Sequence, residues 1–144
     1  IETDQIALIP DSYIDITAEK IRIYKELDST SDDRSLEVMK TKMIDRFGKF
    51  PEEVQRLFDI VRIRHLAEKL GFEKVIIKNG VMIAFFISNP LSKYYRSKKF
   101  SQILEAINEN APLFELKQND DKLRIFVKNV DSIAKAYSVL NKLQ

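Results

Sequence analysis

Several residue types that carry common chemistries are absent or rare in this sequence. It has no cysteine, which excludes disulfide bonds, thiolate metal ligands and a cysteine nucleophile. None of its three glycines, Gly48, Gly71 and Gly80, stands in the closely spaced pattern that a phosphate-binding loop requires before a helix. The sequence therefore carries no recognisable nucleotide site. The longest apolar run, residues 81–87, has the length of a strand and is too short to span a bilayer.

The composition is that of an ordinary globular protein. Of 144 residues, 44% are hydrophobic and 32% are charged, and 24 Lys+Arg against 22 Asp+Glu leave a net charge of +2. This charge is too small to indicate a nucleic-acid-binding protein. The length predicts a single domain, 1–144, with a core of its own. Because the chain begins at Ile1 inside a strand-like run and shows no secretion signal, we expect a piece of a longer, non-secreted polypeptide.

Residues 1–72 are predicted to form a mostly helical half. A short strand over residues 3–9 is followed by a helix that ends near Leu27. The polar stretch after it predicts a second helix, whose N-cap is Thr30 or Ser31. Apolar residues at helical spacing place one face of each helix in a core.

The third helix of this half has the clearest boundaries. Pro51 stands at the first turn, two glutamates follow it, and Gly71 ends the apolar pattern. Apolar residues occur on two sides of this helix over residues 52–70. A helix that is apolar on two sides is packed on two sides, so we expect this one to be central.

Residues 73–144 are predicted to form a hairpin–helix–hairpin–helix half. Asn79-Gly80 between two runs of β-formers is the strongest short signal for a hairpin. The expected elements are strands at 75–78 and 81–88, a helix at 98–110, strands at 113–117 and 122–128, and a helix at 131–143. The fold class is α+β, in which an N-terminal strand and three-helix segment packs with a ββαββα antiparallel-sheet segment whose helices cover one face.

Residues that could carry catalysis have ordinary structural explanations. His65, the only histidine, lies in a helical pattern without visible partners for a metal site or a proton relay, so a structural role is favoured. The acidic pairs Asp32-Asp33, Glu52-Glu53 and Asp120-Asp121 fall at helix starts or turns, where capping and solvation explain them. We therefore expect no catalytic, cofactor or metal site in this chain.

One short run combines basic and aromatic side chains, as contacts with nucleic acid require. The candidate binding residues are Lys93, Tyr94, Tyr95, Arg96, Lys98 and Lys99. Three interpretations stay open: a nucleic-acid contact, a contact with an acidic protein surface, and a solvated loop whose tyrosines close the core. A single short basic run on a nearly neutral chain favours the solvated loop.

Four blocks of the sequence follow one another in a characteristic order and spacing: Ala7–Ile14, Glu19–Lys25, Ile44–Val54 and Val61–Phe72. Together they resemble the C-terminal domain of bacterial transcription-repair coupling factor. The resemblance is good from Ile6 to Phe72, and beyond it extends only to length and element order. Here Ile14 meets Asp15 directly where the family usually has a proline, and Glu26 stands where a basic residue is common. These departures concern the surface of the first helix.

The resemblance implies a regulatory piece of a motor protein. The parent would be an ATP-dependent translocase on double-stranded DNA that displaces stalled RNA polymerase and recruits excinuclease A, with ATP and Mg bound by its motor domains. This domain would dock on the excinuclease-B-like N-terminal module and mask the surface that recruits excinuclease A. The resemblance further implies a bacterial cytoplasmic protein, no membrane partner, and no enzymatic activity or cofactor in the fragment itself. A nucleic-acid-binding module that uses residues 93–99 is the alternative function.

Overall fold

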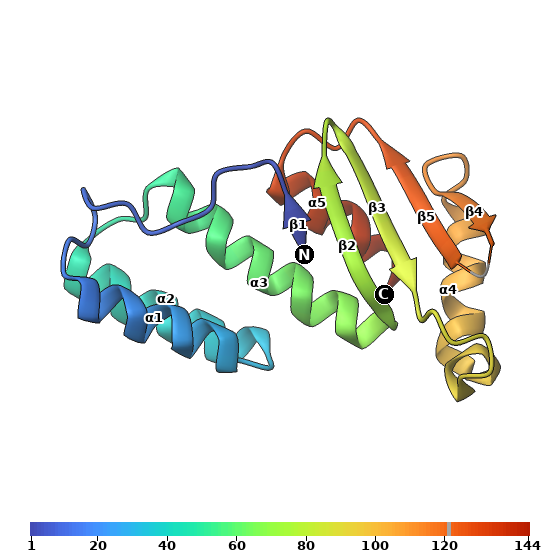
Figure 1. Ribbon diagram of the computed structural model, residues 1–144, viewed down its shortest axis with the longest axis horizontal. Helices are drawn as coiled ribbons and strands as arrows, with labels where there is room; N and C mark the ends of the chain where they lie inside the picture. Colours follow the sequence, from blue (N-terminus) through green and yellow to red (C-terminus); the bar gives the residue numbers. More distant parts are fainter. Residues whose placement is uncertain (121) are drawn as a thin grey trace. The chain divides into compact units, whose positions relative to one another are not determined.

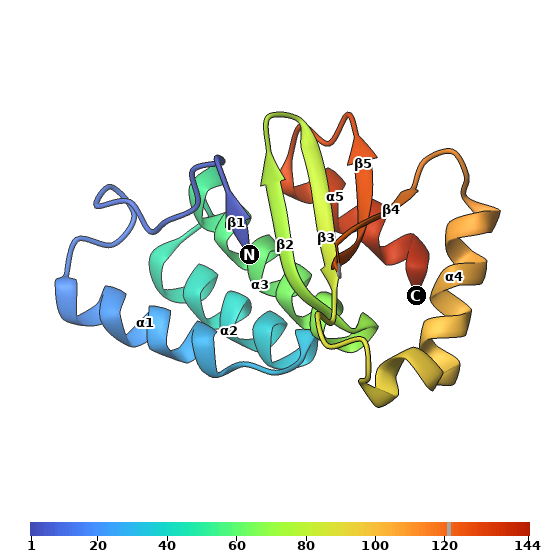
Figure 2. The ribbon, with the colours of Figure 1, turned by 45° about the vertical axis from the view of Figure 1, so that its right-hand side comes forward.

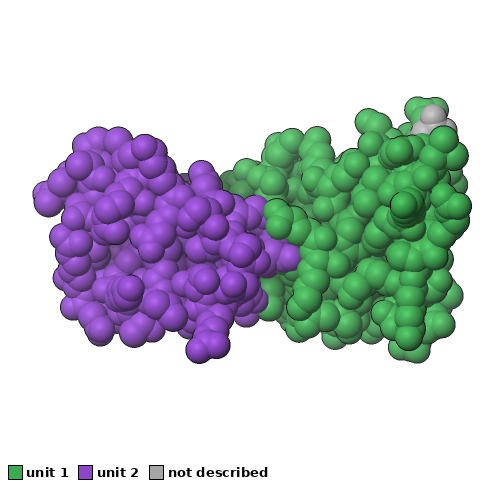
Figure 3. All heavy atoms as spheres, turned by 90° about the horizontal axis from the view of Figure 1, so that it is seen from below, with its two compact units in different colours: residues 1–5, 66–144 green, residues 6–65 purple. Residues whose placement is uncertain are grey.

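The chain divides into two compact units, which Figure 3 shows in different colours. The computed structural model describes residues 1–120 and 122–144, so Asp121 of the acidic pair Asp120-Asp121 lies outside the described residues. Unit 1 comprises residues 1–5 and 66–144, and unit 2 comprises residues 6–65. The expectation of a single domain over residues 1–144 stays a prediction.

Unit 2 is helical, as the sequence predicts for this part of the chain. Its elements are α1 (Thr17–Ser29), α2 (Asp33–Phe47) and α3 (Glu52–Leu70), whose last residues belong to unit 1. The two-sided apolar pattern of α3 is confirmed in part by burial, because Val54 and Phe58 join the core of unit 2 while Ile63 is fully buried outside that cluster. The core of unit 2 consists of Ile9, Ile14, Ile23, Leu27, Leu36, Met39, Met43, Val54, Phe58 and Val61.

The N-cap of α2 differs from the sequence-based expectation. Asp32, and neither Thr30 nor Ser31, occupies the cap, and its carboxylate accepts a hydrogen bond of 2.7 Å from the backbone N–H of Ser35. This bond lowers the pKa of Asp32, because it stabilises the charged form. The hydroxyl of Thr30 instead donates to the carbonyl of Leu27 at the end of α1.

Unit 1 is built on a five-stranded sheet, which Figures 1 and 2 show from two directions. The strands lie in the order β1-β2-β3-β5-β4. Their bounds are β1 (Glu2–Thr3), β2 (Phe72–Lys78), β3 (Val81–Phe86), β4 (Glu115–Asn119) and β5 (Lys122–Lys128). The α+β class and the two hairpins are therefore confirmed.

The N-terminal strand corrects one expectation. A strand is predicted over residues 3–9, but β1 comprises only Glu2 and Thr3, and it pairs in parallel with β2 at Ile76 and Ile77. The strands of the ββαββα segment pair antiparallel as predicted, and the one parallel pair of β1 makes the whole sheet mixed. Only residues that lie beside β2 find backbone partners there, which the local alternation of residue types does not reveal.

The predicted hairpin turn at Asn79-Gly80 has the expected geometry. Both residues have positive φ, 54° and 75°, as the tight turn between antiparallel strands requires. Two further helices, α4 (Lys98–Glu109) and α5 (Ile133–Leu140), lie on one face of the sheet, as the sequence predicts (Figures 1 and 2). The side chains that point toward this covered face include the buried Ile77, Met82 and Ile125.

The other face of the sheet is not covered by α4 or α5, and we call it the open sheet face. The residues that alternate toward it are exposed or half-buried. Six residues on it are Lys74, Ile76, Ile83, Phe85, Arg124 and Phe126.

Candidate functional site

The candidate run 93–99 forms the connection between β3 and α4. Lys93–Arg96 form a short 3-10 helix, which begins where the Ser92 hydroxyl accepts a hydrogen bond from the N–H of Tyr94. Ser97 then caps α4 by accepting a hydrogen bond of 3.2 Å from the N–H of Phe100. The run is therefore an ordered turn whose shape is fixed by two serine caps.

Both tyrosines of this run are anchored within unit 1. The hydroxyl of Tyr94 donates to the carbonyl of Leu70 at 2.6 Å, and that of Tyr95 donates to the carbonyl of Ile87. Both rings pack edge-on or tilted against Phe100, with centroids 5.4 Å and 5.0 Å away. Burial raises the pKa of both hydroxyls. These contacts occupy the rings, so they support the interpretation in which the tyrosines close the core.

The cations of the run are more accessible than its rings. Lys93, Arg96 and Lys98 are exposed, and Lys99 is half-buried. Such charges can neutralise phosphates or carboxylates, but the anchored tyrosines leave this site without a free stacking platform. Binding of nucleic acid or of an acidic surface at residues 93–99 stays a prediction.

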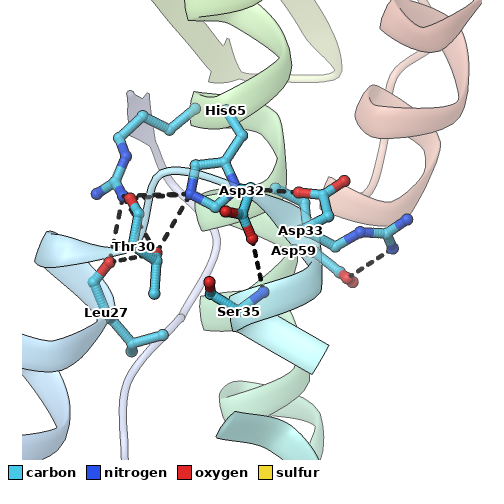
Figure 4. A network of polar contacts seen from close by, with 9 residues as sticks. Leu27, Thr30, Asp32, Asp33, Ser35, Asp59 and His65 are labelled. Carbon is cyan, nitrogen blue, oxygen red and sulfur yellow. Dashed lines mark hydrogen bonds and ion pairs between the residues drawn. The ribbon is translucent and has the colours of Figure 1, made fainter. Parts of the chain in front are cut away.

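His65 occupies a polar junction in unit 2, shown in Figure 4. Its side chain is 6% exposed, with Nδ1 2.9 Å from a carboxylate oxygen of Asp33 and Nε2 3.1 Å from the carbonyl oxygen of Thr30. The guanidinium of Arg64 donates to the carbonyls of Leu27 and Thr30 at 3.2 Å and 2.8 Å. These bonds satisfy the backbone where α1 ends, so the structural role expected of His65 agrees with its contacts.

A groove lies between α1 and α2 of unit 2, with a volume of about 280 Å³. Its floor is apolar and its rim is charged. The floor consists of Ile23, Met39, Met43 and Phe47, and the rim of Arg22, Glu26, Lys42 and Arg46.

The rim of this groove is organised by Glu19. One carboxylate oxygen of Glu19 accepts from Arg22 and the other from Arg46, each at 2.7 Å. These two guanidinium groups lower the pKa of Glu19, so it stays ionised. The three side chains link α1 to the end of α2, while Lys42 is exposed beside them.

Sequence reasoning missed this groove because its residues are far apart in the chain. Arg22 and Arg46 lie inside two blocks that resemble the coupling factor, 19–25 and 44–54, but the two residues belong to different helices. Helical spacing shows which residues share a face of one helix, and it does not show which two faces meet.

Residues 1–120 and 122–144 form neither a cluster of metal ligands nor a helix that could span a membrane. No group of three or more histidine, aspartate or glutamate side chains is placed to hold a metal ion. None of the helices formed by these residues combines the length and apolar character that a membrane span requires.

These features define an α+β module with a mixed sheet in one unit and a groove-bearing helical unit in the other. The chain belongs to the TRCF domain family, whose profile matches residues 3–97. The family match thus continues beyond Phe72, where the sequence resemblance was expected to be limited to length and element order.

Individual relatives agree with this assignment. The chain is 32% identical over 123 residues to the transcription-repair-coupling factor of Rickettsia bellii, covering 85% of this chain and 10% of that protein. It is 36% identical over 75 residues to that of Escherichia coli, covering 52% of this chain and 6% of that protein. The chain thus spans about a tenth or less of the length of these curated relatives.

A solved structure confirms the fold. A crystal structure of the C-terminal domain of transcription-repair coupling factor matches with a TM-score of 0.78 at 22% identity. The match covers 99% of this chain and 86% of that chain.

Proposed function

We propose that this chain is the C-terminal regulatory domain of a bacterial transcription-repair coupling factor and acts as an autoinhibitory interaction domain. Family membership and the names of the relatives support the parent protein. The observation that carries the regulatory role is the α1–α2 groove of unit 2, with its apolar floor and charged rim.

In this proposal the parent is a cytoplasmic, ATP-dependent translocase on double-stranded DNA. It displaces RNA polymerase stalled at lesions and recruits excinuclease A, while ATP and Mg serve motor domains outside these residues. The fragment itself performs no catalysis. Its partner is the excinuclease-B-like N-terminal module, whose surface for excinuclease A it masks.

The groove suits a contact that must open again. A small apolar floor gives some binding energy, while the rim charges set orientation and exclude wrong partners. On this rim Arg22 and Arg46 are already paired with Glu19, and Arg22 also with Glu26, so Lys42 is the rim cation without a described ion pair. We infer that the masked module presents a carboxylate to Lys42.

A tethered cover needs little intrinsic affinity. A linker within one polypeptide gives an effective concentration that reaches roughly the millimolar range, so even a weak contact stays closed. Release requires a conformation of the motor that disfavours the closed contact by a few kcal/mol. The domain then works as a steric brake that the motor removes.

Deleting this segment from the intact parent tests the proposal. We expect higher ATPase turnover, tighter DNA binding and stronger pull-down of excinuclease A, because the brake is gone. The proposal fails when all three are unchanged.

Charge reversal in the intact parent tests the groove itself. Lys42→Glu should reproduce the deletion in part, because it places a carboxylate opposite the carboxylate of the module. The matched control is Lys49→Glu, an exposed cation that does not line the groove. Equal effects of Lys42→Glu and Lys49→Glu would place the docking surface elsewhere.

A further inference from the structure

The open sheet face of unit 1 has an apolar row along its middle. Cross-strand register aligns Ile76 of β2 with Ile83 of β3 and Phe126 of β5. All three are half-buried, although neither α4 nor α5 covers them. Phe85 on β3 stands on the same face and is also half-buried. Side chains of this kind on a sheet normally pack against another layer.

Basic side chains flank this apolar row on both sides. On one side, register aligns Lys74, Phe85, Arg124 and Lys117 across four strands. On the other side, register aligns Lys78, Val81 and Lys128 across three strands. The apolar row is therefore bordered by basic side chains on both sides.

Among the described residues, the acidic side chains of this face stand on its edge strands. Glu2 on the edge strand β1 pairs with Lys74 at 3.2 Å, and Glu115 on the edge strand β4 pairs with Lys117 at 3.8 Å. Arg124 and Lys128 lie on the interior strand β5, and no described carboxylate lies within ion-pair distance of either. These two charges are therefore uncompensated within the described part of the chain.

Arg124 has a further unmet requirement. Its Nε–H is buried and has no hydrogen-bond acceptor in the described part of the chain. Its guanidinium lies over the ring of Phe126, 5.0 Å from the centroid, and Lys117 lies over the same ring at 4.4 Å. A buried donor without an acceptor is costly, and a carboxylate bound to the terminal nitrogens of this guanidinium would give the cation a charge-assisted partner.

The face continues into a hollow beside Phe126 and Lys128. Its other walls come from the chain before and within β4, where Leu113 is exposed. An apolar side chain fits there next to the charge of Lys128. A partner that matches this surface thus alternates apolar and acidic groups.

We propose that the open sheet face binds an acidic, amphipathic segment of a partner protein. The apolar side chains of that segment would cover Ile83 and Phe126, and its carboxylates would pair with Arg124 and Lys128. Nucleic acid fits less well, because cations already cover the ring of Phe126 on which a base would have to stack. This surface belongs to unit 1 and is independent of the groove proposed for autoinhibition.

A peptide selection against the 144-residue chain tests the proposal. A displayed library of random 16-residue peptides is enriched on the wild-type chain, and the affinities of the winners are measured. We expect enriched peptides that combine Asp or Glu with aromatic or aliphatic residues, and affinities that fall as salt rises. Arg124→Gln and Lys128→Gln should each weaken binding about tenfold, as expected for the loss of a charge-assisted contact.

Controls make each outcome decisive. Lys135→Gln removes an exposed cation on α5 and should change affinity less than about twofold, as expected for a charge outside the contact. Because Lys128 is exposed, Lys128→Gln should retain the wild-type melting temperature. The proposal is overturned by no enrichment, by winners without acidic residues, or by winners insensitive to both face variants. The proposal would also be overturned if a 15-nucleotide oligo-dT bound this face more tightly than the selected peptides do.

Discussion

At the end of α3 in unit 1, a tyrosine closes the helix terminus, whereas at the end of α1 in unit 2 an arginine and a histidine do so. The hydroxyl of Tyr94 reaches the carbonyl of Leu70, where α3 ends, and its ring fills the space beside Gly71. At the end of α1, Arg64 and His65 bind backbone carbonyls instead. Both solutions satisfy helix C-termini.

The two solutions have different weaknesses. The tyrosine ring stabilises the helix end mainly by packing, so removing its hydroxyl should destabilise the fold less than adding an atom to the space that the ring fills. The polar junction stabilises the helix end by hydrogen bonds, so removing one of their partners should destabilise the fold. Unit 1 should therefore be sensitive to added volume near Tyr94, and unit 2 to removal of donors near Thr30.

Gly71→Ala should have the largest effect. Gly71 has a φ of +94°, and a Cβ there would lie 2.2 Å from Cε1 of Tyr94. Backbone strain and overpacking together should cost about 4 kcal/mol of unfolding free energy. Urea denaturation measures this loss, and amide exchange should place it in unit 1.

Gly48→Ala is the matched control in unit 2. Gly48 has the same φ of +94°, but nothing lies within 4 Å of the added Cβ. Only the backbone cost of about 2 kcal/mol should remain. If the two variants lost the same free energy of unfolding, the Tyr94 ring would move aside for the added Cβ. Unit 1 would then not be sensitive to added volume at this position.

His65→Ala should be the next most damaging change. It removes the imidazole that contacts Thr30 and Asp33, and it opens space in a buried junction. A loss of about 2 kcal/mol in thermal or urea unfolding is expected. The exposed control Arg34→Ala should stay within about 0.5 kcal/mol. A His65 variant as stable as this control would contradict the polar-junction interpretation.

Removing single hydroxyls compares the two units directly. Tyr94→Phe deletes the bond to the carbonyl of Leu70 but keeps the ring, and Tyr24→Phe deletes the acceptor of the Ile9 N–H in unit 2. Each should cost about 1 kcal/mol in urea unfolding. If Tyr94→Phe lowered the free energy of unfolding as much as Gly71→Ala, the hydroxyl of Tyr94, and not the packing of its ring, would stabilise the end of α3.

The local elements could be predicted because short-range signals determine them. Asn79-Gly80 specifies a hairpin by the positive φ of both residues, and Pro51 marks the start of α3. The parallel pairing of β1 escaped prediction because its partner, Ile76, is far away in the chain.

The candidate site was harder to predict for the same reason. The basic and aromatic run 93–99 gives no sign that the carbonyls of Leu70 and Ile87 occupy both tyrosine hydroxyls. The groove of unit 2 joins residues of two helices, and the open sheet face joins residues of several strands. Each surface exists only once the fold has brought distant residues together.

The smallest expected effect concerns pH, and its sign differs between the units. Burial raises the pKa of Asp59 in unit 2, whereas Lys74 lowers the pKa of Glu2 in unit 1. For Asp59, the folded chain holds its proton more tightly than the unfolded chain, so its contribution to stability is present below about pH 4 and is lost as pH rises through the folded pKa. For Glu2, the contribution is present above about pH 4.3 and is lost as pH falls through the folded pKa.

Asp59→Asn and Glu2→Gln remove these two titrations and should change the pH dependence of stability in opposite directions. Urea unfolding between pH 3 and 7 measures the stability of each variant relative to wild type. Relative to wild type, Asp59→Asn should gain stability as pH rises, because it lacks the cost of burying a carboxylate, and Glu2→Gln should lose stability, because it lacks the ion pair with Lys74. Parallel slopes for the two variants would mean that Asp59 is compensated by Arg62, 3.7 Å away, as fully as Glu2 is by Lys74. The contrast between a buried acid in unit 2 and a paired surface acid in unit 1 would then not hold.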